Sequence, residues 1–207
     1  MKIEIPLELE TLLTPALMAA AEPVTVGKGL PLFRQRQKPR FMHFVVTGEV
    51  LLQRMDEQGA ALVLQRVRRG FVAEASLQAL VYHCDAIAAT PSQLVRLPLA
   101  DLRMALASDA RFSQKWISML SAELRQARLQ CERLSLKGVG ERLVHLIRTE
   151  GAQGRLPMAS GLKSLAGDLA VTHEALYRAV AALEREGRLQ RVDGHLVWTP
   201  PGQPANR

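Results

Sequence analysis

Two charged side chains one helical turn apart, Glu174 and Arg178, are the residues of this sequence whose spacing is best suited to chemistry. The guanidinium of Arg178 can donate to guanine O6 and N7, and the carboxylate of Glu174 can accept from cytosine N4. His173 and Tyr177 flank this pair. The same spacing is also typical of an ordinary ion pair on a helix surface. The elements that carry the pair therefore decide between the two interpretations.

The elements expected around this pair are two helices separated by a short turn. Apolar residues recur at helical spacing from 162 to 169, and residues 170–172 interrupt the pattern. A second helix is expected over 173–186, with Thr172 as its N-cap. Its apolar face is predicted to consist of Leu176, Val180 and Leu183, and Glu174 and Arg178 lie on a different face.

Two short strands, 189–192 and 195–198, are expected after the second helix. Asp193-Gly194, which joins them, is a preferred pair for a tight hairpin turn. This order is the plan of a winged helix-turn-helix, whose second helix fits the DNA major groove. We therefore expect base contacts from the second helix and phosphate contacts around it. The predicted DNA-binding residues are Lys163, Thr172, His173, Glu174, Tyr177, Arg178 and Arg191, of which Lys163, Thr172 and Arg191 would contact phosphates.

His173-Glu174-x-x-x-Arg178 resembles the recognition-helix signature of the Crp/Fnr (cyclic-AMP receptor protein-like) family of bacterial transcription regulators. The usual forms there are Arg-Glu-x-x-x-Arg and Glu-x-x-Ser-Arg, whereas here the first basic residue is His173 and the Ser position is Tyr177. The resemblance extends from about Val24 to Trp198. It implies an α+β fold with a cyclic-nucleotide-binding-like β-roll (1–108), a dimerisation helix (109–137) and a winged helix-turn-helix (138–207).

The segment from Val24 to Pro98 supports the β-roll independently. Short β-rich runs are separated by glycines, and Asp56-Glu57-Gln58-Gly59 is predicted to form a hairpin loop. Many short strands at close spacing are typical of a small antiparallel barrel or roll. The run from Phe41 to Val50, which contains Gly48, resembles the central hairpin of the cyclic-nucleotide-binding roll.

In that fold the ligand site contains Gly-Glu, followed ten residues later by Arg-Ser. The Glu is retained here as Glu74, but the Arg-Ser positions hold Cys84 and Asp85. A cyclic phosphate needs a cation and hydroxyl donors, and two facing anions repel in a partly desolvated pocket. We therefore predict an effector or redox signal other than cyclic AMP. The expected effector pocket consists of Glu74, Ser76, His83, Cys84 and Asp85.

Three interpretations of His83-Cys84-Asp85 are open. These residues could line a pocket or the core, Cys84 could be a redox-reactive thiol activated by His83, or the set could bind a metal ion or haem. His43 on another strand could approach the same pocket. The chain has two cysteines, Cys84 and Cys131. Two are too few for a disulfide framework, a four-thiolate zinc site or a four-thiolate iron–sulfur cluster within one chain.

A long helix is expected from residue 109 to about 137. Its apolar residues recur at alternating spacings of three and four, and they are Ile117, Leu120, Leu124, Ala127, Cys131 and Leu134. The helix could pack on its own β-domain, but a sustained period of 3.5 favours a parallel homodimer, and the resemblance implies the same. Cys131 would then lie near the twofold axis, where oxidation could join two copies. Gly138 and Gly140 are predicted to form a hinge after this helix.

The composition agrees with a globular nucleic-acid-binding protein. The 207 residues carry a net charge of +7, which suits a polyanionic partner, and 48% of them are hydrophobic. The sequence has neither an apolar run of about 20 residues nor a signal-peptide pattern at its N-terminus, so we expect a cytoplasmic protein without membrane contact. The Pro- and Gly-rich tail, 200–207, is expected to fray.

The pattern as a whole predicts a transcription regulator that binds an inverted repeat as a homodimer. The resemblance implies double-stranded DNA, RNA polymerase and a small-molecule effector as partners. A cupin-like metalloenzyme with an accessory interaction domain is the alternative, and it would require clustered ligands such as His-x-His. The five histidines, at 43, 83, 145, 173 and 195, contain no such pair, and we therefore expect no enzyme activity.

Overall fold

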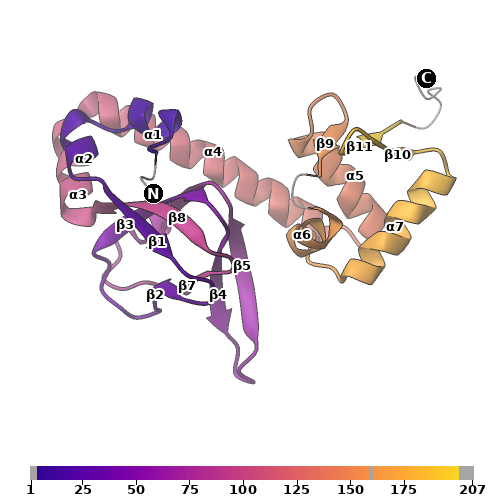
Figure 1. Ribbon diagram of the computed structural model, residues 1–207, viewed down its shortest axis with the longest axis horizontal. Coiled ribbons are helices and arrows are strands. Elements are labelled where there is room, and N and C mark those ends of the chain that lie inside the picture. The colour runs from indigo at the N-terminus through magenta and orange to yellow at the C-terminus, as the bar shows by residue number, and fades with distance from the viewer. Residues whose placement is uncertain (1–3, 159–160, 201–207) are drawn as a thin grey trace. The chain divides into compact units, whose positions relative to one another are not determined.

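The computed structural model describes residues 4–158 and 161–200, and the tail predicted to fray lies outside this range except for Pro200. The chain divides into two compact units, one ending at Met119 and the other beginning at Leu120 (Figure 1). The long helix α4, Ala110–Ser135, contributes residues to both units.

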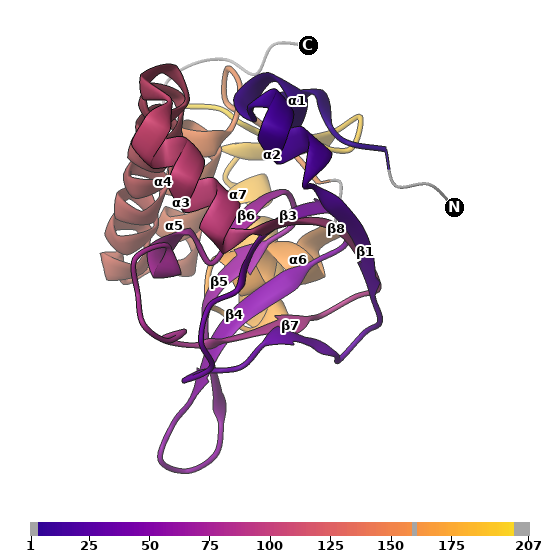
Figure 2. The ribbon, with the colours of Figure 1, turned by 90° about the vertical axis from the view of Figure 1, so that its left-hand side faces the viewer.

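The first unit is an antiparallel β-roll preceded by two short helices, α1 (Leu7–Leu12) and α2 (Pro15–Ala19). Within the described residues, its strands form two four-stranded sheets (Figure 2). The β1-β8-β3-β6 sheet contains Glu22–Val26, Ser92–Pro98, Phe41–Thr47 and Gly70–Val72. The β2-β7-β4-β5 sheet contains Pro31–Phe33, Asp85–Ala88, Val50–Met55 and Ala61–Val67. The predicted β-roll is confirmed.

The roll closes around an apolar core in which Met42, Val45, Val50 and Leu94 have no exposed surface. The turn between β3 and β4 requires glycine at Gly48, because its φ is +94° and a Cβ atom there would lie 2.3 Å from Ser92 Oγ. Ser92 Oγ in turn accepts a hydrogen bond from the Glu49 amide. The glycine therefore permits the close approach that joins the two sheets at this corner.

After the roll come α3 (Leu99–Ser108) and α4. The carboxylate of Asp109 accepts from the Phe112 amide at 2.9 Å and so caps the start of α4. Phe112 and Trp116 are buried, and the Trp116 ring lies 4.9 Å from that of Phe71 on β6. Aromatic packing therefore attaches the first turns of α4 to the roll. The predicted long helix agrees with α4 to within two residues at each end.

The second unit is a winged helix-turn-helix, as predicted. It contains the rest of α4, α5 (Val139–Glu150), α6 (Gly161–Asp168), α7 (His173–Arg185), β10 (Leu189–Val192) and β11 (His195–Trp198). Its core contains Leu143, Ile147, Leu169, Leu176, Val180 and Leu196. Asp193 and Gly194 both have positive φ, +48° and +72°, which is the hairpin conformation that their sequence predicts.

A third strand of this unit was not predicted from the sequence: Arg155–Pro157 forms β9 and pairs with β11. Of the two glycines of the predicted hinge, Gly138 is the N-cap of α5 and its amide donates to Glu141 Oε2, whereas Gly140 lies in the first turn of α5. The residues between the two helices are therefore 136–138.

Candidate nucleic-acid interface and effector pocket

Helix α7 is held in place by its cap and its buried face. The Thr172 hydroxyl accepts from the Ala175 amide at 3.2 Å, as its sequence position predicts. Leu176 and Val180 are fully buried and Leu183 is 6% exposed, and all three belong to the core of the unit. This packing determines which side of α7 remains in contact with solvent.

The opposite side of α7 carries an exposed polar surface, here called the recognition face, made of Thr172, His173, Glu174, Tyr177 and Arg178. No ion pair joins Glu174 to Arg178 within the described residues, so the surface-pair alternative is not realised in this structure. Backbone hydrogen bonding and the Thr172 hydroxyl lower the pKa of Glu174, with smaller contributions from His173 and Arg178. Glu174 is therefore ionised at neutral pH and able to accept hydrogen bonds. Lys163 on α6 is exposed as well.

The wing contacts this face through Arg191 on β10. Its Nε lies 2.9 Å from Glu184 Oε1, and its guanidinium carbon lies 5.8 Å from the centre of the Tyr177 ring. The Tyr177 and His173 rings lie 4.9 Å apart, edge to face. Arg191, which was predicted to contact phosphate, thus has its guanidinium engaged by Glu184 and Tyr177. Glu184 carries no sequence signal for this pairing, because the pair joins a helix to a strand.

The turn between α6 and α7 is tied to the end of α4 by Arg142. Its guanidinium donates to the carbonyl oxygens of Leu136 at 2.8 Å, Leu134 at 3.2 Å and Leu169 at 3.2 Å. Ala170 has a φ of +51°, and the Val171 amide donates back to the Ala166 carbonyl. Arg142 therefore connects the end of the long helix with the turn that orients α7. No feature of the sequence pattern identified this role.

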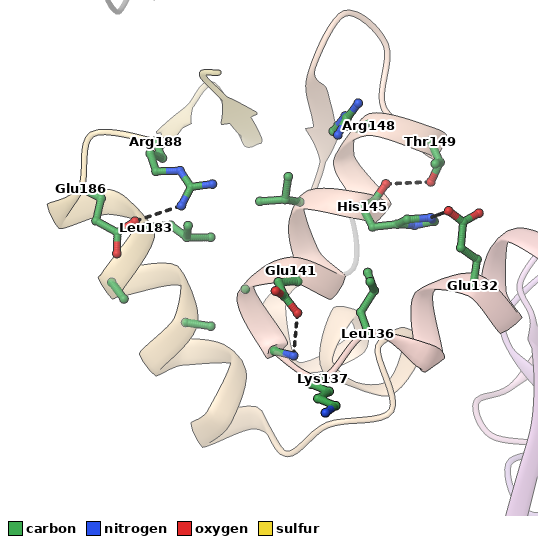
Figure 3. Close-up of a pocket in the computed structure, with 15 residues that line it drawn as sticks. Glu132, Leu136, Lys137, Glu141, His145, Arg148, Thr149, Leu183, Glu186 and Arg188 are labelled. Atoms are coloured by element: carbon green, nitrogen blue, oxygen red, sulfur yellow. Dashed lines mark hydrogen bonds and ion pairs between the residues drawn. The ribbon is translucent and has the colours of Figure 1, made fainter. Parts of the chain in front are cut away.

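A groove of about 870 Å³ lies between α5 and the side of α7 that carries Ala179 and Ala182 (Figure 3). His145 points toward Glu132, with Nε2 3.4 Å from its carboxylate. Lys137 and Arg148 also line the groove, and neither has an ion pair in the described part of the chain. The groove adjoins residues 136–138, so its shape depends on the break between α4 and α5.

In the roll, the segment that corresponds to the expected effector site keeps an unusual backbone. Ala73 has a φ of +85° and precedes the short 3₁₀ helix Glu74–Ser76. Burial raises the pKa of Glu74, and its Oε2 has no hydrogen-bond partner within the described residues. Ser76 is 2% exposed, and its hydroxyl lies 3.5 Å from His83 Nδ1. The structure thus brings Glu74, Ser76 and His83 into one region of the roll.

Asp85 is already paired in this region. Its carboxylate accepts from Arg34 NH1 at 2.9 Å and from the Gln35 amide at 2.7 Å. Arg34 carries no sequence signal for this pairing, because the pair spans 51 residues of chain. The Asp85 charge is therefore compensated within the roll, and the Arg34 guanidinium is occupied by that pairing.

Cys84 is 1% exposed, and burial raises the pKa of its thiol. The Arg54 cation opposes this shift, while the Asp85 and Glu74 charges add to it. His83 is exposed and does not contribute to the shift. This environment favours the protonated thiol, the opposite of what activation by His83 would require. Among the described residues there is no group of three or more His, Cys, Asp or Glu side chains that could hold a metal ion.

His43 lies apart from these residues, in the roll core. It is 8% exposed, and its ring lies 6.0 Å from that of Phe33 and 6.4 Å from that of Phe41. Burial, with a smaller contribution from Arg96, lowers the pKa of His43 to about 4. The side chain is therefore neutral at physiological pH.

The predicted seam of α4 is largely exposed. Ile117 is 55% exposed, Leu124 52% and Leu134 37%, and Ala127 and Cys131 are exposed too, whereas Leu120 is partly buried. No helix within the described residues is long and apolar enough to cross a membrane.

Comparisons with known proteins agree with this architecture. Residues 23–109 match the family model of the cyclic nucleotide-binding domain. The global nitrogen regulator of a Nostoc species is 25% identical over 147 residues, which are 68% of this chain and 64% of that relative, less than two thirds of its length. FixK2 from Bradyrhizobium japonicum is 18% identical with a TM-score of 0.65, over 87% of this chain and 93% of that one.

A further similar structure is that of a sensor domain alone. The sensor domain of the transcriptional regulator DNR from Pseudomonas aeruginosa is 27% identical with a TM-score of 0.50, over 62% of this chain and 90% of that one. FixK2 covers 87% of this chain, so its structural similarity includes residues of both units.

Proposed function

We propose that this chain, which has the fold of Crp/Fnr-type transcription regulators, binds an inverted-repeat DNA site as a homodimer and responds to a signal other than cyclic AMP. Its β-roll is the sensor, α4 is the dimerisation helix and the winged helix-turn-helix is the DNA-binding unit. Two of the similar proteins are named as regulators, the global nitrogen regulator and the transcriptional regulator DNR, and they support a role in transcription rather than catalysis.

The recognition face of α7 carries this proposal. Glu174 and Arg178 are exposed on a helix whose other side is packed in the core, and no ion pair joins them within the described residues. Such a helix can enter the major groove, where Arg178 would donate to guanine and Glu174 would accept from cytosine. Lys163 and the first turn of α7 at Thr172 would contact phosphates, and these contacts would position the helix without specifying a sequence.

The exposed seam of α4 supports a homodimer. An apolar row of this length is unfavourable in water, and a second copy of the same helix is the partner that its 3.5-residue period fits. Two recognition helices related by a twofold axis need to lie about 34 Å apart to enter successive major grooves. A palindromic site follows from that symmetry.

The residues of the roll support an effector other than cyclic AMP. The positions that would supply a cation and a hydroxyl hold a buried thiol and a carboxylate, and Arg34 is occupied by that carboxylate. A cyclic phosphate placed there would face the carboxyl groups of Asp85 and Glu74, while Arg34 is paired with Asp85 and Arg54 donates to the His83 carbonyl. Titration calorimetry should therefore show no tight binding of cyclic AMP, and a tight complex would contradict this part of the proposal.

Helix α4 is the natural route from signal to DNA. Its first turns are packed on the roll through Phe112 and Trp116, and its last turn is bonded to the DNA-binding unit by Arg133, which pairs with Glu150, and by Arg142. A change in the roll that shifts α4 would reach α7 through these contacts. Regulation would then be a difference in DNA affinity between two orientations of the recognition helices.

Selection of bound DNA from a random pool by the purified full-length protein, with and without reductant, tests this function. Enrichment of a palindrome under either condition is expected. Enrichment in one condition alone would identify a thiol as the sensor, and enrichment in both would direct the search to a small ligand. Enrichment of sequences without twofold symmetry would contradict the dimeric mode, and retention of every sequence alike would contradict sequence-specific binding.

A further inference from the structure

Tyr177 lies on the recognition face, but the base contacts proposed for Glu174 and Arg178 give it no role. Its side chain is 46% exposed, although removing an aromatic ring from water is favourable. Tyr177 and Arg178 are both exposed on the recognition face of α7, so a base contacted by Tyr177 lies in the same half-site as the base pair that Arg178 contacts and close to it. The phenol hydroxyl makes no hydrogen bond within the described part of the chain.

The Tyr177 ring is held from two sides. The His173 ring meets it edge to face at 4.9 Å from the preceding helical turn. Arg191 lies over the ring from the wing at 5.8 Å, a distance at which a guanidinium is attracted to an aromatic face. The ring is therefore oriented before any DNA arrives, which reduces the entropy lost on binding.

Arg191 is itself fixed by Glu184. Its Nε and NH2 groups lie 2.9 Å and 3.4 Å from the two carboxylate oxygens, a two-point contact that orients the guanidinium plane. A cation engaged in this way is a weak candidate for phosphate binding, because the carboxylate already neutralises it. Its position over Tyr177 gives it a different use, as a support for the ring.

We propose that Tyr177 is a specificity-determining residue that recognises the 5-methyl group of a thymine, and that Arg191, held by Glu184, is the positioning residue for its ring. An oriented aromatic surface in the major groove distinguishes bases mainly by apolar contact, and the thymine methyl is the apolar group exposed there. This inference rests on the proposed DNA-binding function. It adds a preference for thymine next to the base pair that Arg178 contacts.

The test uses deoxyuridine, which differs from thymidine only by the absent methyl group. In the palindrome selected from the random pool, each symmetric pair of thymines is replaced by deoxyuridine in turn, and the full-length protein is titrated with each duplex. The duplex with deoxyuridine at the thymine pair next to the Arg178 contact should bind about fourfold more weakly per half-site. This is the ratio expected from removing one buried methyl group.

Variants separate recognition from mere proximity. Tyr177→Phe should keep the preference for thymine over deoxyuridine, because it keeps the ring. Tyr177→Ala and Tyr177→Ser should bind both duplexes equally. Arg191→Ala should reduce the thymine preference although it leaves Tyr177 in place. Thermal unfolding of each variant verifies that the exposed substitutions leave the fold intact.

The outcomes distinguish this inference from the function on which it rests. Specific binding with equal affinity for thymine and deoxyuridine at every position would overturn the role of Tyr177 and leave the regulator intact. An equal loss of affinity for both duplexes in Arg191→Ala would make Arg191 a phosphate contact and overturn its positioning role. Failure to bind any sequence specifically would overturn the proposed function together with this inference.

Discussion

Replacing Arg142 with alanine should loosen two segments that are distant in sequence, the end of α4 and the turn before α7. The guanidinium donates to the carbonyls of Leu134 and Leu136 in the first segment and of Leu169 in the second. The alanine side chain has no hydrogen-bond donor, so it cannot make these bonds, and the C-terminus of α4 also loses a cation that its dipole favours. Both segments should therefore open more often in the variant.

The size of the effect follows from the bond lengths and the exposure of the site. Hydrogen bonds from a charged donor contribute about 1.5–3 kcal/mol each. The Leu136 bond, at 2.8 Å, has a favourable length, whereas the other two, at 3.2 Å, are at the long end of the usual range. The residue is only partly buried, so water can replace some of the donors. We expect a total of about 2–3 kcal/mol rather than the sum of three full bonds.

Amide hydrogen exchange is the suitable assay, because it measures each segment separately. The Leu136 amide, which donates to Arg133, and the Val171 amide, which donates to Ala166, report on the two segments. A loss of 2–3 kcal/mol should accelerate their exchange roughly 30- to 150-fold. Arg142→Lys should fall between the two extremes, because it keeps the charge and loses the planar fork.

The matched control is Arg148→Ala, which removes the same side chain from an exposed position on the same helix. It should leave exchange at Leu136 and Val171 close to that of the unmodified protein. Equal exchange in the Arg142 and Arg148 variants would refute the reasoning. Acceleration at Leu136 alone would refute the claim that Arg142 connects α4 with the turn before α7.

Four further expectations follow from the structure. Arg178→Ala should cost about 1–3 kcal/mol of DNA affinity and relax selectivity at one base pair, whereas an equal loss on all sequences in competition binding would make it a phosphate contact. Leu124→Lys should convert the dimer to monomer in sedimentation experiments, because it places a charge in the seam, and an unchanged dimer would argue against that interface. In a Cys131→Ser background, Cys84 should resist alkylation at neutral pH until the roll unfolds, because it is buried and its pKa is raised, and rapid labelling of the folded protein would contradict this. Burial lowers the pKa of His43 from 6.5 to about 4, so between these pH values the unfolded chain binds more protons than the folded one. The stability of the roll in urea titrations should therefore fall by about 3 kcal/mol as the pH drops from 6.5 to 4, and His43→Leu should remove this pH dependence.

Sequence alone determined the features that depend on neighbours along the chain. The spacing of Leu176, Val180 and Leu183 predicted the buried side of α7, and Thr172 and Asp193-Gly194 predicted its cap and the wing turn. These features are readable because a helix repeats every 3.6 residues, and because caps and tight turns are completed within a few residues. The recognition face was predicted as the remainder of that helix.

Resemblance extended the prediction to the roll, where spacing by itself indicated only short antiparallel strands. It located Glu74, Cys84 and Asp85 in one region, and the structure agrees that Cys84 lies close enough to both carboxylates for their charges to affect its pKa. It could not supply Arg34, because nothing within a few residues of Asp85 distinguishes that arginine from the others in the roll.

Tertiary structure alone decided the pairings between distant segments. Arg34 with Asp85, Arg191 with Glu184, the carbonyl contacts of Arg142 and the pairing of β9 with β11 each join elements whose relative position depends on the whole core. A polar side chain shows no periodicity that specifies its partner, and several cations compete for each carboxylate in the sequence. Which pair forms is settled by where the packed core places the backbone, because a hydrogen bond or ion pair is strong only within a few ångströms.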